Sequence, residues 1–321
     1  MALLDIQDLY LEINHLGRRA SVLHGVNLRV DAGEIVGLVG ETGSGKTLTA
    51  LSTLRLLPPG GKLTRGQLLF DGLDLVTATD AQVHALRGRR IGLIFQQARA
   101  ALNPTRPVLQ QLVDRFIDLR QLTRKAALEG SIELLKQVGL PEPEVRGWQY
   151  PHQLSGGMCQ RVMIALAIAA GPKLLLADEP TTGLDVTLQA QILELLTGLA
   201  QQEQLAVLLI THDLAMVAES CHRVAVMYAG EVVEEGLTAD VLYRPKHPYT
   251  VGLVNAVASL EAGQRPVAIP GMVARFQEPP PFCPFAARCP QAFGRCHQER
   301  PTLREFEPTR QVACHLDANT E

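Results

Sequence analysis

The stretch GETGSGKT, residues 40–47, decides the fold of this chain. It matches the phosphate-binding pattern of a glycine, four residues and then Gly-Lys-Ser/Thr. The apolar run EIVGLV, residues 34–39, lies just before it and predicts a buried strand, and leucines at helical spacing follow in residues 48–57. Strand, glycine-rich loop and helix form the context that this pattern needs, which favours a nucleotide site over an ordinary glycine-rich turn.

The residue types of this loop suit the phosphates of ATP. The glycines lack a Cβ, so the backbone can bend around a phosphate and direct its N–H groups inward. The start of the following helix adds partial positive charge. Lys46 can reach the β- and γ-phosphates, and the hydroxyl of Thr47 can hold Mg²⁺. The predicted ATP-binding loop is Gly40, Glu41, Thr42, Gly43, Ser44, Gly45, Lys46 and Thr47.

Composition favours a cytoplasmic globular protein. The 321 residues, 46% of them hydrophobic, are enough for one large domain and a smaller one. A net charge of −3 without a basic block gives no electrostatic reason to expect nucleic acid. The N-terminus lacks the basic region of a signal peptide, and a Gly-Pro-Lys sequence at residues 171–173 splits the most apolar window. We therefore expect a cytoplasmic protein, or one that partners hold at a membrane.

The pattern of the whole chain predicts a mostly parallel α/β core, because apolar strands alternate with amphipathic helices. The first thirty residues alternate in polarity and predict antiparallel strands around a loop at residues 14–19. Helical periodicity over residues 108–138 predicts a helical insertion. Hairpins are expected at residues 66–75 and 224–236. The expected core strands are residues 34–39, 91–96, 174–180 and 206–213.

Polar side chains follow several of these strands, and parallel sheets bind ligands at the carboxyl ends of their strands. Asp178 can hold Mg²⁺ through water, and the adjacent Glu179 can orient or deprotonate an attacking water. Gln96 can contact the metal or the γ-phosphate, and His212 can donate a hydrogen bond to the γ-phosphate. A single glutamine or histidine at a strand end is more often structural, so the prediction depends on the ordered set.

That ordered set resembles the ATP-binding cassette (ABC) ATPases. LSGGM, residues 154–158, is similar to their signature motif, TTGLD, residues 181–185, to their D-loop, and THD, residues 211–213, to their switch histidine. The resemblance extends over about residues 4–236. It implies an α/β P-loop NTPase fold with an antiparallel β subdomain, a helical subdomain at about residues 97–157, and an ATPase domain ending at residue 245.

The resemblance also implies how the site is shared. Two such subunits pack head to tail, and each ATP lies between one phosphate-binding loop and the signature motif of the other subunit. The D-loop residue that the resemblance implies is Asp185. Closure with ATP and opening after hydrolysis would act as a two-state switch. The signature residues that would serve the partner's ATP are Ser155, Gly156, Gly157 and Gln160.

The C-terminal part of the sequence, or tail, resembles one particular group of these ATPases. HPYT, residues 247–250, and residues 282–316 resemble the C-terminal extension of oligopeptide/dipeptide importer ATPases, which we place at residues 246–321 after a proline-bearing linker at residues 265–281. Five, six and seventeen residues separate the four tail cysteines. Thiolates suit iron–sulfur clusters or zinc, and this spacing by itself does not choose between them. The four cysteines are Cys283, Cys289, Cys296 and Cys314.

In that family, four tail cysteines resemble the ligands of a [4Fe–4S] cluster; zinc and metal-free thiols are the alternatives. His297 and His315 each follow a cysteine, but four thiolates already complete a tetrahedral set. Cys159 and Cys221 lie elsewhere in the sequence and are expected to be ordinary cysteines. Structural disulfides are not expected in a cytoplasmic chain.

Three positions depart from the family pattern. The place of the adenine-stacking aromatic residue is Ile13, with Tyr10 three residues earlier. Cys159 stands in the signature motif where peptide importers usually place a basic residue. The loop after Gln96 reads FQQARAALNP, where relatives often read FQDP. The catalytic positions match, so we expect a competent ATPase.

The resemblance implies the ATPase subunit of a peptide importer at the cytoplasmic face of the cell membrane. Its expected partners are a second ABC ATPase, two transmembrane permease subunits, and a periplasmic or lipoprotein substrate-binding protein. Nickel, glutathione and antimicrobial-peptide importers use similar subunits and stay open as alternatives. A soluble ABC ATPase of translation or DNA repair would usually carry two cassettes or a coiled-coil insertion, and a P-loop kinase or GTPase has no use for the SGG and TTGLD motifs.

Overall fold

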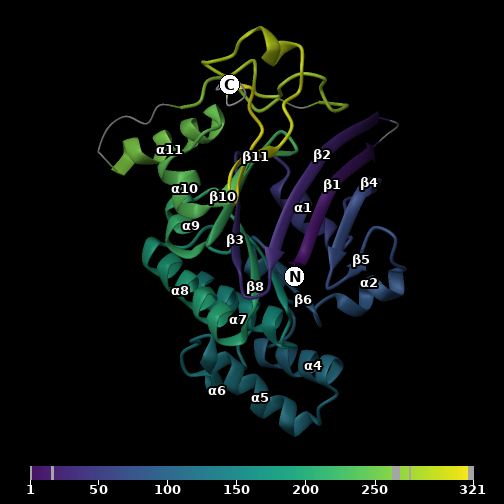
Figure 1. The fold of residues 1–321 in the computed structure, drawn as a ribbon. Coiled ribbons are helices and arrows are strands. Elements are labelled where there is room, and N and C mark those ends of the chain that lie inside the picture. The colour runs from purple at the N-terminus through teal and green to yellow at the C-terminus, as the bar shows by residue number, and fades with distance from the viewer. Residues whose placement is uncertain (1, 16–17, 262–267, 275, 317–321) are drawn as a thin grey trace. The chain divides into compact units, whose positions relative to one another are not determined.

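The structure is a computed structural model that describes residues 2–15, 18–261, 268–274 and 276–316. The chain forms two compact units (Figure 1). Unit 1 comprises Met1–Asp31, Ile35–Ala78 and Ile210–Glu321, and unit 2 comprises Ala32–Glu34 and Thr79–Leu209. Parts of the predicted 14–19 loop, of the predicted linker and of the predicted extension lie outside the described residues.

The elements follow the alternation that the sequence predicts. The strands are β1 (Ala2–His15), β2 (Arg18–Asp31), β3 (Ile35–Val39), β4 (Gly61–Phe70), β5 (Leu73–Asp74), β6 (Ile91–Ile94), β7 (Leu174–Asp178), β8 (Ala206–Ile210), β9 (Arg223–Tyr228), β10 (Glu231–Leu237), β11 (Arg304–Glu307) and β12 (Arg310–Val312). The helices are α1 (Lys46–Ser52), α2 (Asp80–Leu86), α3 (Ala98–Ala101), α4 (Val108–Arg120), α5 (Arg124–Gln137), α6 (Pro143–Arg146), α7 (Gly156–Ile168), α8 (Val186–Glu203), α9 (Leu214–Ser220), α10 (Thr238–Tyr243) and α11 (Pro248–Glu261), with short 3₁₀ turns at Pro151–Gln153 and Gly294–His297.

Unit 1 contains the predicted antiparallel sheet, with strand order β2-β1-β4-β5. The apolar residues of β1 and β2 largely alternate with polar ones, and most of the apolar residues are buried. The turn between β4 and β5 uses Asp71 and Gly72, both at positive φ, as the expected DG hairpin requires. The antiparallel layer and its hairpin are therefore confirmed.

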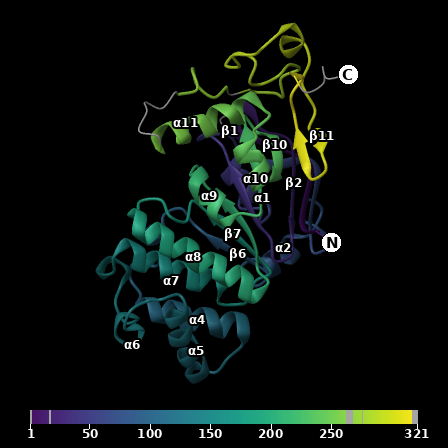
Figure 2. The same cartoon turned by 60° about the vertical axis from the view of Figure 1, so that its left-hand side comes forward.

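Unit 1 also contains a run of strands in the order β11-β12-β10-β9-β3. β3 pairs in parallel with β9, and β9 and β10 form the predicted hairpin across Ala229 and Gly230, both at positive φ. β12, from the tail, extends this sheet by pairing with β10 (Figures 1 and 2). The tail thus contributes strands to the same sheet that carries the phosphate-binding loop.

Unit 2 contains β8, β7 and β6 in that order, together with the helices α2 to α8. β6 and β7 are parallel, and β7 is buried along its whole length. The helical stretch predicted over residues 108–138 is interrupted rather than continuous. Gln121 adopts φ +54° and ends α4, and the hydroxyl of Thr123 accepts the N–H of Ala126 at 3.4 Å and begins α5.

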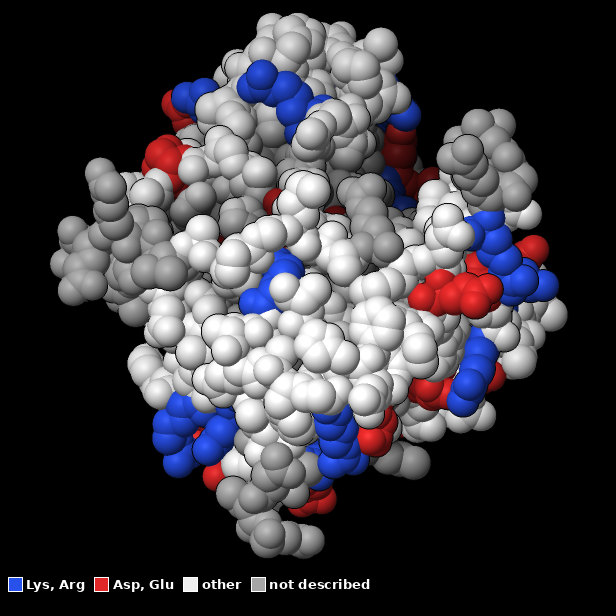
Figure 3. Space-filling view, turned by 90° about the horizontal axis from the view of Figure 1, so that it is seen from above, with Lys and Arg blue, Asp and Glu red and all other residues white. Residues whose placement is uncertain are grey.

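Two further sequence expectations concern the surface. Among the described residues, no helix combines the length and apolar character that crossing a bilayer requires. On the face in Figure 3, the basic and acidic side chains that are described lie in small neighbouring groups rather than in one broad basic patch. This distribution agrees with the absence of a basic block in the sequence.

Candidate nucleotide-binding site

The phosphate-binding loop follows β3 directly, and α1 begins at Lys46. Gly40, Gly43 and Gly45 adopt φ values of +148°, +86° and +110°, which L side chains rarely adopt. A Cβ on Gly40 would also collide with the backbone carbonyl oxygen of Met227 in β9. The loop therefore needs its first glycine for both its dihedral angles and its close packing.

Two polar side chains of the loop, those of Lys46 and Ser44, are buried. The Nζ of Lys46 donates to the carbonyl oxygens of Gly40 at 2.7 Å and Glu41 at 3.0 Å, and the side chain is almost fully buried. The buried hydroxyl of Ser44 has no partner among the described residues. A buried hydroxyl without a partner costs free energy, and a phosphate oxygen would satisfy it. The loop residues therefore fit a bound phosphate.

His212 also lies in unit 1, in the turn between β8 and α9. Asp213 caps α9 by accepting the N–H groups of Ala215 at 2.9 Å and Met216 at 3.1 Å. The hydroxyl of Thr211 accepts the N–H of Asp213 at 3.0 Å. These bonds fix the backbone on either side of His212 and leave its side chain exposed to solvent.

Unit 2 brings together the predicted catalytic carboxylate and the predicted glutamine. The Nε2 of Gln96 donates to the Oε2 of Glu179 at 2.6 Å, and the hydroxyl of Thr182 donates to the same oxygen at 2.9 Å. The pairing of β6 with β7 places the ends of the two strands side by side. Glu179 adopts φ +46°, so the chain turns sharply after the buried Asp178. Gln96 and Glu179, both expected at the carboxyl ends of strands, are thus hydrogen-bonded to each other.

The signature motif caps a helix. The hydroxyl of Ser155 accepts the N–H of Met158 at 3.3 Å at the start of α7, and a Cβ on Gly157 would press on Leu188. The Nε2 of Gln160 is buried and has no partner among the described residues. Cys159 is buried and donates to the carbonyl oxygen of Pro151 at 3.4 Å, so it acts as a core residue.

The D-loop residue Asp185 is exposed and caps α8 by accepting the N–H of Leu188 at 3.0 Å. Tyr10, one of the two residues near the expected adenine position, lies beneath the guanidinium of Arg65, with 5.2 Å from Cζ to the ring centroid. Ile13 is half-buried in β1. The adenine contact of either residue stays a prediction.

The four tail cysteines lie near one another. The N–H of Cys283 donates to the carbonyl oxygen of Cys296 at 3.0 Å. Burial raises the pKa of the Cys283 thiol to about 12, and the thiols of Cys296, Cys314 and Cys289 add to this rise. None of the six cysteines, all of them among the described residues, forms a disulfide bond, and Cys221 is buried in the core.

A metal centre is not formed in this arrangement. Within the described ranges, no group of three or more His, Cys, Asp or Glu side chains is placed to hold a metal ion. His315 is buried and its Nε2 lies 2.9 Å from the carbonyl oxygen of Glu299, whereas His297 is exposed. The iron–sulfur expectation therefore has no support in the geometry beyond the proximity of the thiols.

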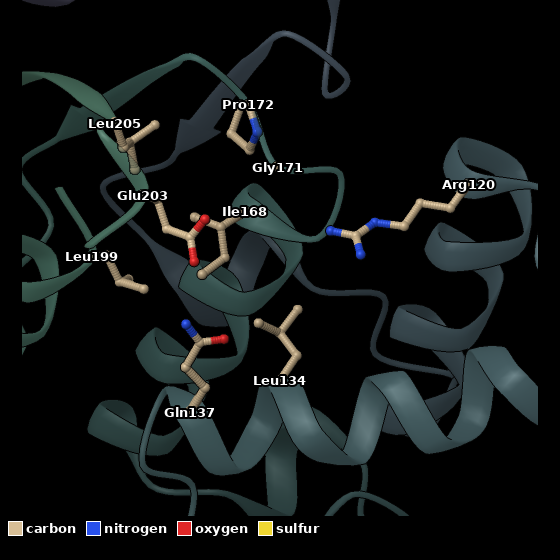
Figure 4. Close-up of a pocket in the computed structure, with 9 residues that line it drawn as sticks. All are labelled: Arg120, Leu134, Gln137, Ile168, Gly171, Pro172, Leu199, Glu203 and Leu205. Atoms are coloured by element: carbon tan, nitrogen blue, oxygen red, sulfur yellow. The ribbon is translucent and has the colours of Figure 1, made fainter. Parts of the chain in front are cut away.

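A separate pocket in unit 2 is not the nucleotide site. Figure 4 shows Arg120 reaching toward it from α4 and Leu134 and Gln137 from α5. Its volume of about 130 Å³ is well below the range of about 300–1,000 Å³ usual for ligand pockets. None of the residues predicted to bind ATP lines it. Its lining residues are Arg120, Leu134, Gln137, Ile168, Gly171, Pro172, Leu199, Glu203 and Leu205.

Sequence reasoning missed two residues that touch the phosphate-binding loop. The hydroxyl of Tyr249 and the guanidinium of Arg288 both bind Glu41, from positions 208 and 247 residues away. Tyr249 belongs to the HPYT motif, which indicated the family but not the place of Tyr249 in the fold. Arg288 belongs to no motif, so the sequence held no sign of its role.

Two families match the chain. The family described as ABC transporter matches residues 23–182, and the family described as Oligopeptide/dipeptide transporter, C-terminal region, matches residues 233–296. The second match includes Cys283, Cys289 and Cys296 and ends before Cys314.

Curated relatives match along almost the whole chain. The probable peptide ABC transporter ATP-binding protein y4tR of Sinorhizobium fredii is 45% identical over 317 residues, which are 97% of this chain and 94% of the relative. The oligopeptide transport ATP-binding protein OppD of Bacillus subtilis is 42% identical and covers 98% of this chain and 88% of its own length. The dipeptide transport ATP-binding protein DppD of Haemophilus influenzae is 42% identical over 100% of this chain and 97% of its own length.

Solved structures agree on the fold. A dimeric post-hydrolysis state of the ATP-binding cassette MJ0796 with ADP and Pi has a TM-score of 0.66 and 28% identity, covering 73% of this chain and 98% of that one. The cbiO1 protein of Clostridium perfringens, part of the ABC transporter complex cbiONQ, has a TM-score of 0.67 and 25% identity over 82% of this chain and 99% of its own.

Proposed function

The chain belongs to the ATP-binding subunits of oligopeptide/dipeptide ABC transporters, and from this premise we propose how its residues bind and hydrolyse ATP to energise peptide import. The loop at residues 40–47 holds the phosphates. Lys46 turns from the carbonyl oxygens of Gly40 and Glu41 to the β- and γ-phosphates, and Ser44 gains a partner for its buried hydroxyl. This loop, with its unsatisfied hydroxyl, is the observation that carries the proposal.

Thr47, Gln96 and Asp178 would hold Mg²⁺ with the nucleotide. The donor set consists of a hydroxyl, an amide oxygen and a carboxylate, which are the hard oxygen ligands that Mg²⁺ prefers. When bound, the ion neutralises charge on the phosphate oxygens. Asp178 is buried at the end of β7, where a carboxylate gains from a nearby cation.

Glu179 would orient the attacking water and accept its proton. Bonds from Gln96 and Thr182 to one carboxylate oxygen hold the side chain in one orientation, which would position the base against the water. His212 would donate to the γ-phosphate. Because these partners reach Glu179 from the loop after β6 and from the loop after β7, a change in either segment would alter the position of the base.

A complete site would need a second ATPase subunit. The signature residues Ser155, Gly156, Gly157 and Gln160 would close over the partner's ATP, and Asp185 would line the same interface. The exposed cap of α7 and the buried, unpartnered amide of Gln160 support this assignment. The transport complex would add two permease subunits and a substrate-binding protein, with this chain at the cytoplasmic face of the membrane.

Residues 246–321 would form the extension typical of this family, and its four cysteines would bind a [4Fe–4S] cluster, with zinc as the alternative. The proposal rests on the proximity of the four thiols and on their softness as ligands. Cluster binding would require all four thiols to lose their protons and draw closer. Anaerobically purified protein should contain about four iron and four sulfide ions per chain. Stoichiometric zinc without sulfide would overturn the cluster.

The test of the catalytic assignment is Glu179→Gln in the assembled transport complex. Loss of a general base slows hydrolysis about 100-fold or more, while bound ATP should be retained. Glu194→Gln, an exposed change on α8 of the same unit, is the matched control and should hydrolyse ATP normally. A normal rate in Glu179→Gln would refute the assignment. Stimulation of the rate by peptides, but not by nickel or glutathione, would identify the substrate class.

A further inference from the structure

We propose that the C-terminal extension positions the phosphate-binding loop, through Arg288 and Tyr249, and so sets the affinity of the chain for ATP. The inference rests on the proposed nucleotide site. The two nitrogens Nη1 and Nη2 of Arg288 donate to Oε2 and Oε1 of Glu41 at 2.7 and 2.9 Å. Such a bidentate pair is stronger and more directional than a single hydrogen bond. It joins the tail to the second residue of the loop.

Three groups of Glu41 are held at once. Its carboxylate accepts both bonds from Arg288, its N–H donates to the hydroxyl of Tyr249 at 2.8 Å, and its carbonyl oxygen accepts from Lys46 at 3.0 Å. The N–H of Ser44 also donates to this carbonyl oxygen, at 3.2 Å. Arg288 and Tyr249, two of the four partners, come from the extension, so Glu41 keeps these two bonds when Lys46 moves.

Lys46 has to give up part of these bonds when ATP binds. Its ammonium has three N–H donors, and two of them already bind the carbonyl oxygens of Gly40 and Glu41, so contacts to both the β- and γ-phosphates require at least one of these bonds to break. Without other anchors, the loop would lose part of its shape when Lys46 turns to the nucleotide. Arg288 and Tyr249 hold Glu41 in place through this exchange, which lowers the ordering cost of binding.

Arg288 is itself rigidly held. Its side chain is 6% exposed, its Nε donates to the carbonyl oxygen of Pro270 at 2.7 Å, and its Nη2 reaches that of Ile269 at 3.3 Å. The guanidinium carbon lies 5.6 Å from the ring centroid of Tyr228 and 5.9 Å from that of Phe285. With these contacts Arg288 has little freedom, so it acts as a fixed clamp rather than a mobile surface charge.

The clamp belongs to the cysteine-bearing turns of the extension. The N–H of Arg288 donates to the carbonyl oxygen of Phe285 at 2.9 Å, and its chain neighbour Cys289 donates to Ala286 at 3.4 Å. A change of geometry at Cys283 or Cys289 would therefore move Arg288. Arg288 therefore links the cysteine-bearing turns, and whatever their thiols bind, to the nucleotide loop.

The experiment measures equilibrium binding of ATP to the purified full-length chain, where hydrolysis in the assembled complex plays no part. Arg288→Ala and Glu41→Gln should each weaken ATP binding about ten-fold, the value expected for loss of hydrogen bonds between charged groups. The double variant should bind no more weakly than either single variant, because both remove the same interaction. Tyr249→Phe should weaken binding a few-fold.

The matched control is Arg295→Ala, which removes a tail arginine whose carboxylate partner, Glu299, is exposed. It should bind ATP as the unchanged chain does. In the assembled complex, Arg288→Ala should raise the KM for ATP about ten-fold and keep kcat within about two-fold. Arg288→Lys, which keeps the charge, should restore part of the affinity and serves if the alanine variant does not fold.

Three results would overturn the proposal: unchanged ATP affinity in a folded Arg288→Ala or Arg288→Lys variant, additive losses in the double variant, or an equal loss in Arg295→Ala. Failure of the nucleotide site itself would be distinct, because the unchanged chain would then not bind ATP at all.

Discussion

The phosphate-binding loop, residues 40–47, and the tail, residues 268–316, contain little regular secondary structure, but they are stabilised in different ways. Within the loop, Lys46 bonds to Gly40 and Glu41, only six and five residues away. The tail is held by pairing of β12 with β10 and by arginines that bind distant glutamates. The pairs are Arg288 with Glu41, Arg300 with Glu231, and Arg310 with Glu234.

This difference in how the two regions are stabilised shows that the tail is an integral part of unit 1. A loose appendage would bind its arginines to solvent or to its own carboxylates, as Arg295 does with Glu299. The side chains of Arg310 and Glu234 are instead 1% and 0% exposed. Glu234 also accepts the N–H groups of Lys246 at 3.0 Å and His247 at 2.9 Å. Charges buried to this extent hold a structure together only while every partner is present.

The largest effect on stability is expected when the buried pair of Arg310 and Glu234 is broken. Arg310→Ala would leave the carboxylate of Glu234 buried without its counter-charge, so the free energy of unfolding should fall by about 3–5 kcal/mol. Urea unfolding of the purified chain measures it. Arg295→Ala, whose pair is exposed, should unfold like the unchanged chain. A loss below about 1 kcal/mol in Arg310→Ala, as for a surface pair, would mean that the tail is only an appendage.

The second prediction separates the effect of a loop residue on ATP binding from its effect on the stability of the fold. Lys46→Ala should weaken ATP binding about 100-fold or more, because the lysine provides charge-assisted bonds to two phosphates. Its melting temperature without nucleotide should change much less than that of Arg310→Ala. Calorimetric titration with ATP checks the first expectation and thermal unfolding the second. Lys62→Ala, an exposed lysine on β4 of the same unit, is the control. Near-normal ATP affinity in Lys46→Ala would contradict the assignment of the loop.

The same difference, between local and distant contacts, explains which features could be predicted from the sequence. The loop, the hairpin at Asp71-Gly72 and the hairpin at Ala229-Gly230 were predictable, because glycines at positive φ and short turns are encoded by neighbouring residues. The sequence placed Gln96 and Glu179 at the carboxyl ends of strands, and their hydrogen bond agrees with the rule that parallel strands gather these ends on one edge. These features depend on local patterns or on general topology.

Other features depend on contacts that no local pattern encodes. Arg288 lies 247 residues from Glu41, and nothing near either residue marks the other. The break between α4 and α5 was missed because apolar spacing continues across it, although Thr123 is a typical residue for the start of a helix. The [4Fe–4S] cluster was predicted from the family resemblance and stays a prediction, since cysteine spacing alone does not choose a metal.

The third prediction concerns how pH changes the stability of the chain through His247, a residue of the C-terminal extension. Burial lowers the pKa of His247 to about 3, and its ring lies 5.8 Å from that of Phe285. The neutral ring is favoured in the folded state, whereas the unfolded chain binds a proton near pH 6.5. Stability should therefore fall as pH drops below about 6.5, by at most about 1.4 kcal/mol per pH unit for this one group.

Urea unfolding at pH 7 and pH 5 tests this expectation. His24, whose pKa burial and then Arg300 lower to about 4, should add to the same slope. His247→Gln should unfold with a smaller difference between the two pH values, and His297→Gln, an exposed tail histidine, with the same difference as the unchanged chain. An unaltered pH slope in His247→Gln would show that this histidine does not couple the tail to pH.

The smallest expected effect tests whether neighbouring residues alone determine the shape of the phosphate-binding loop. Gly43 adopts φ +86°, and a Cβ there would meet nothing within 4 Å. Gly43→Ala should therefore cost only the backbone strain of about 1–2 kcal/mol, measured by urea unfolding without nucleotide. Gly40→Ala should cost more, because its Cβ would also strike the carbonyl of Met227, far along the chain. Equal costs would mean that local dihedral angles alone shape the loop. A larger cost at Gly40 would show that even this motif depends on a distant strand, as the tail does.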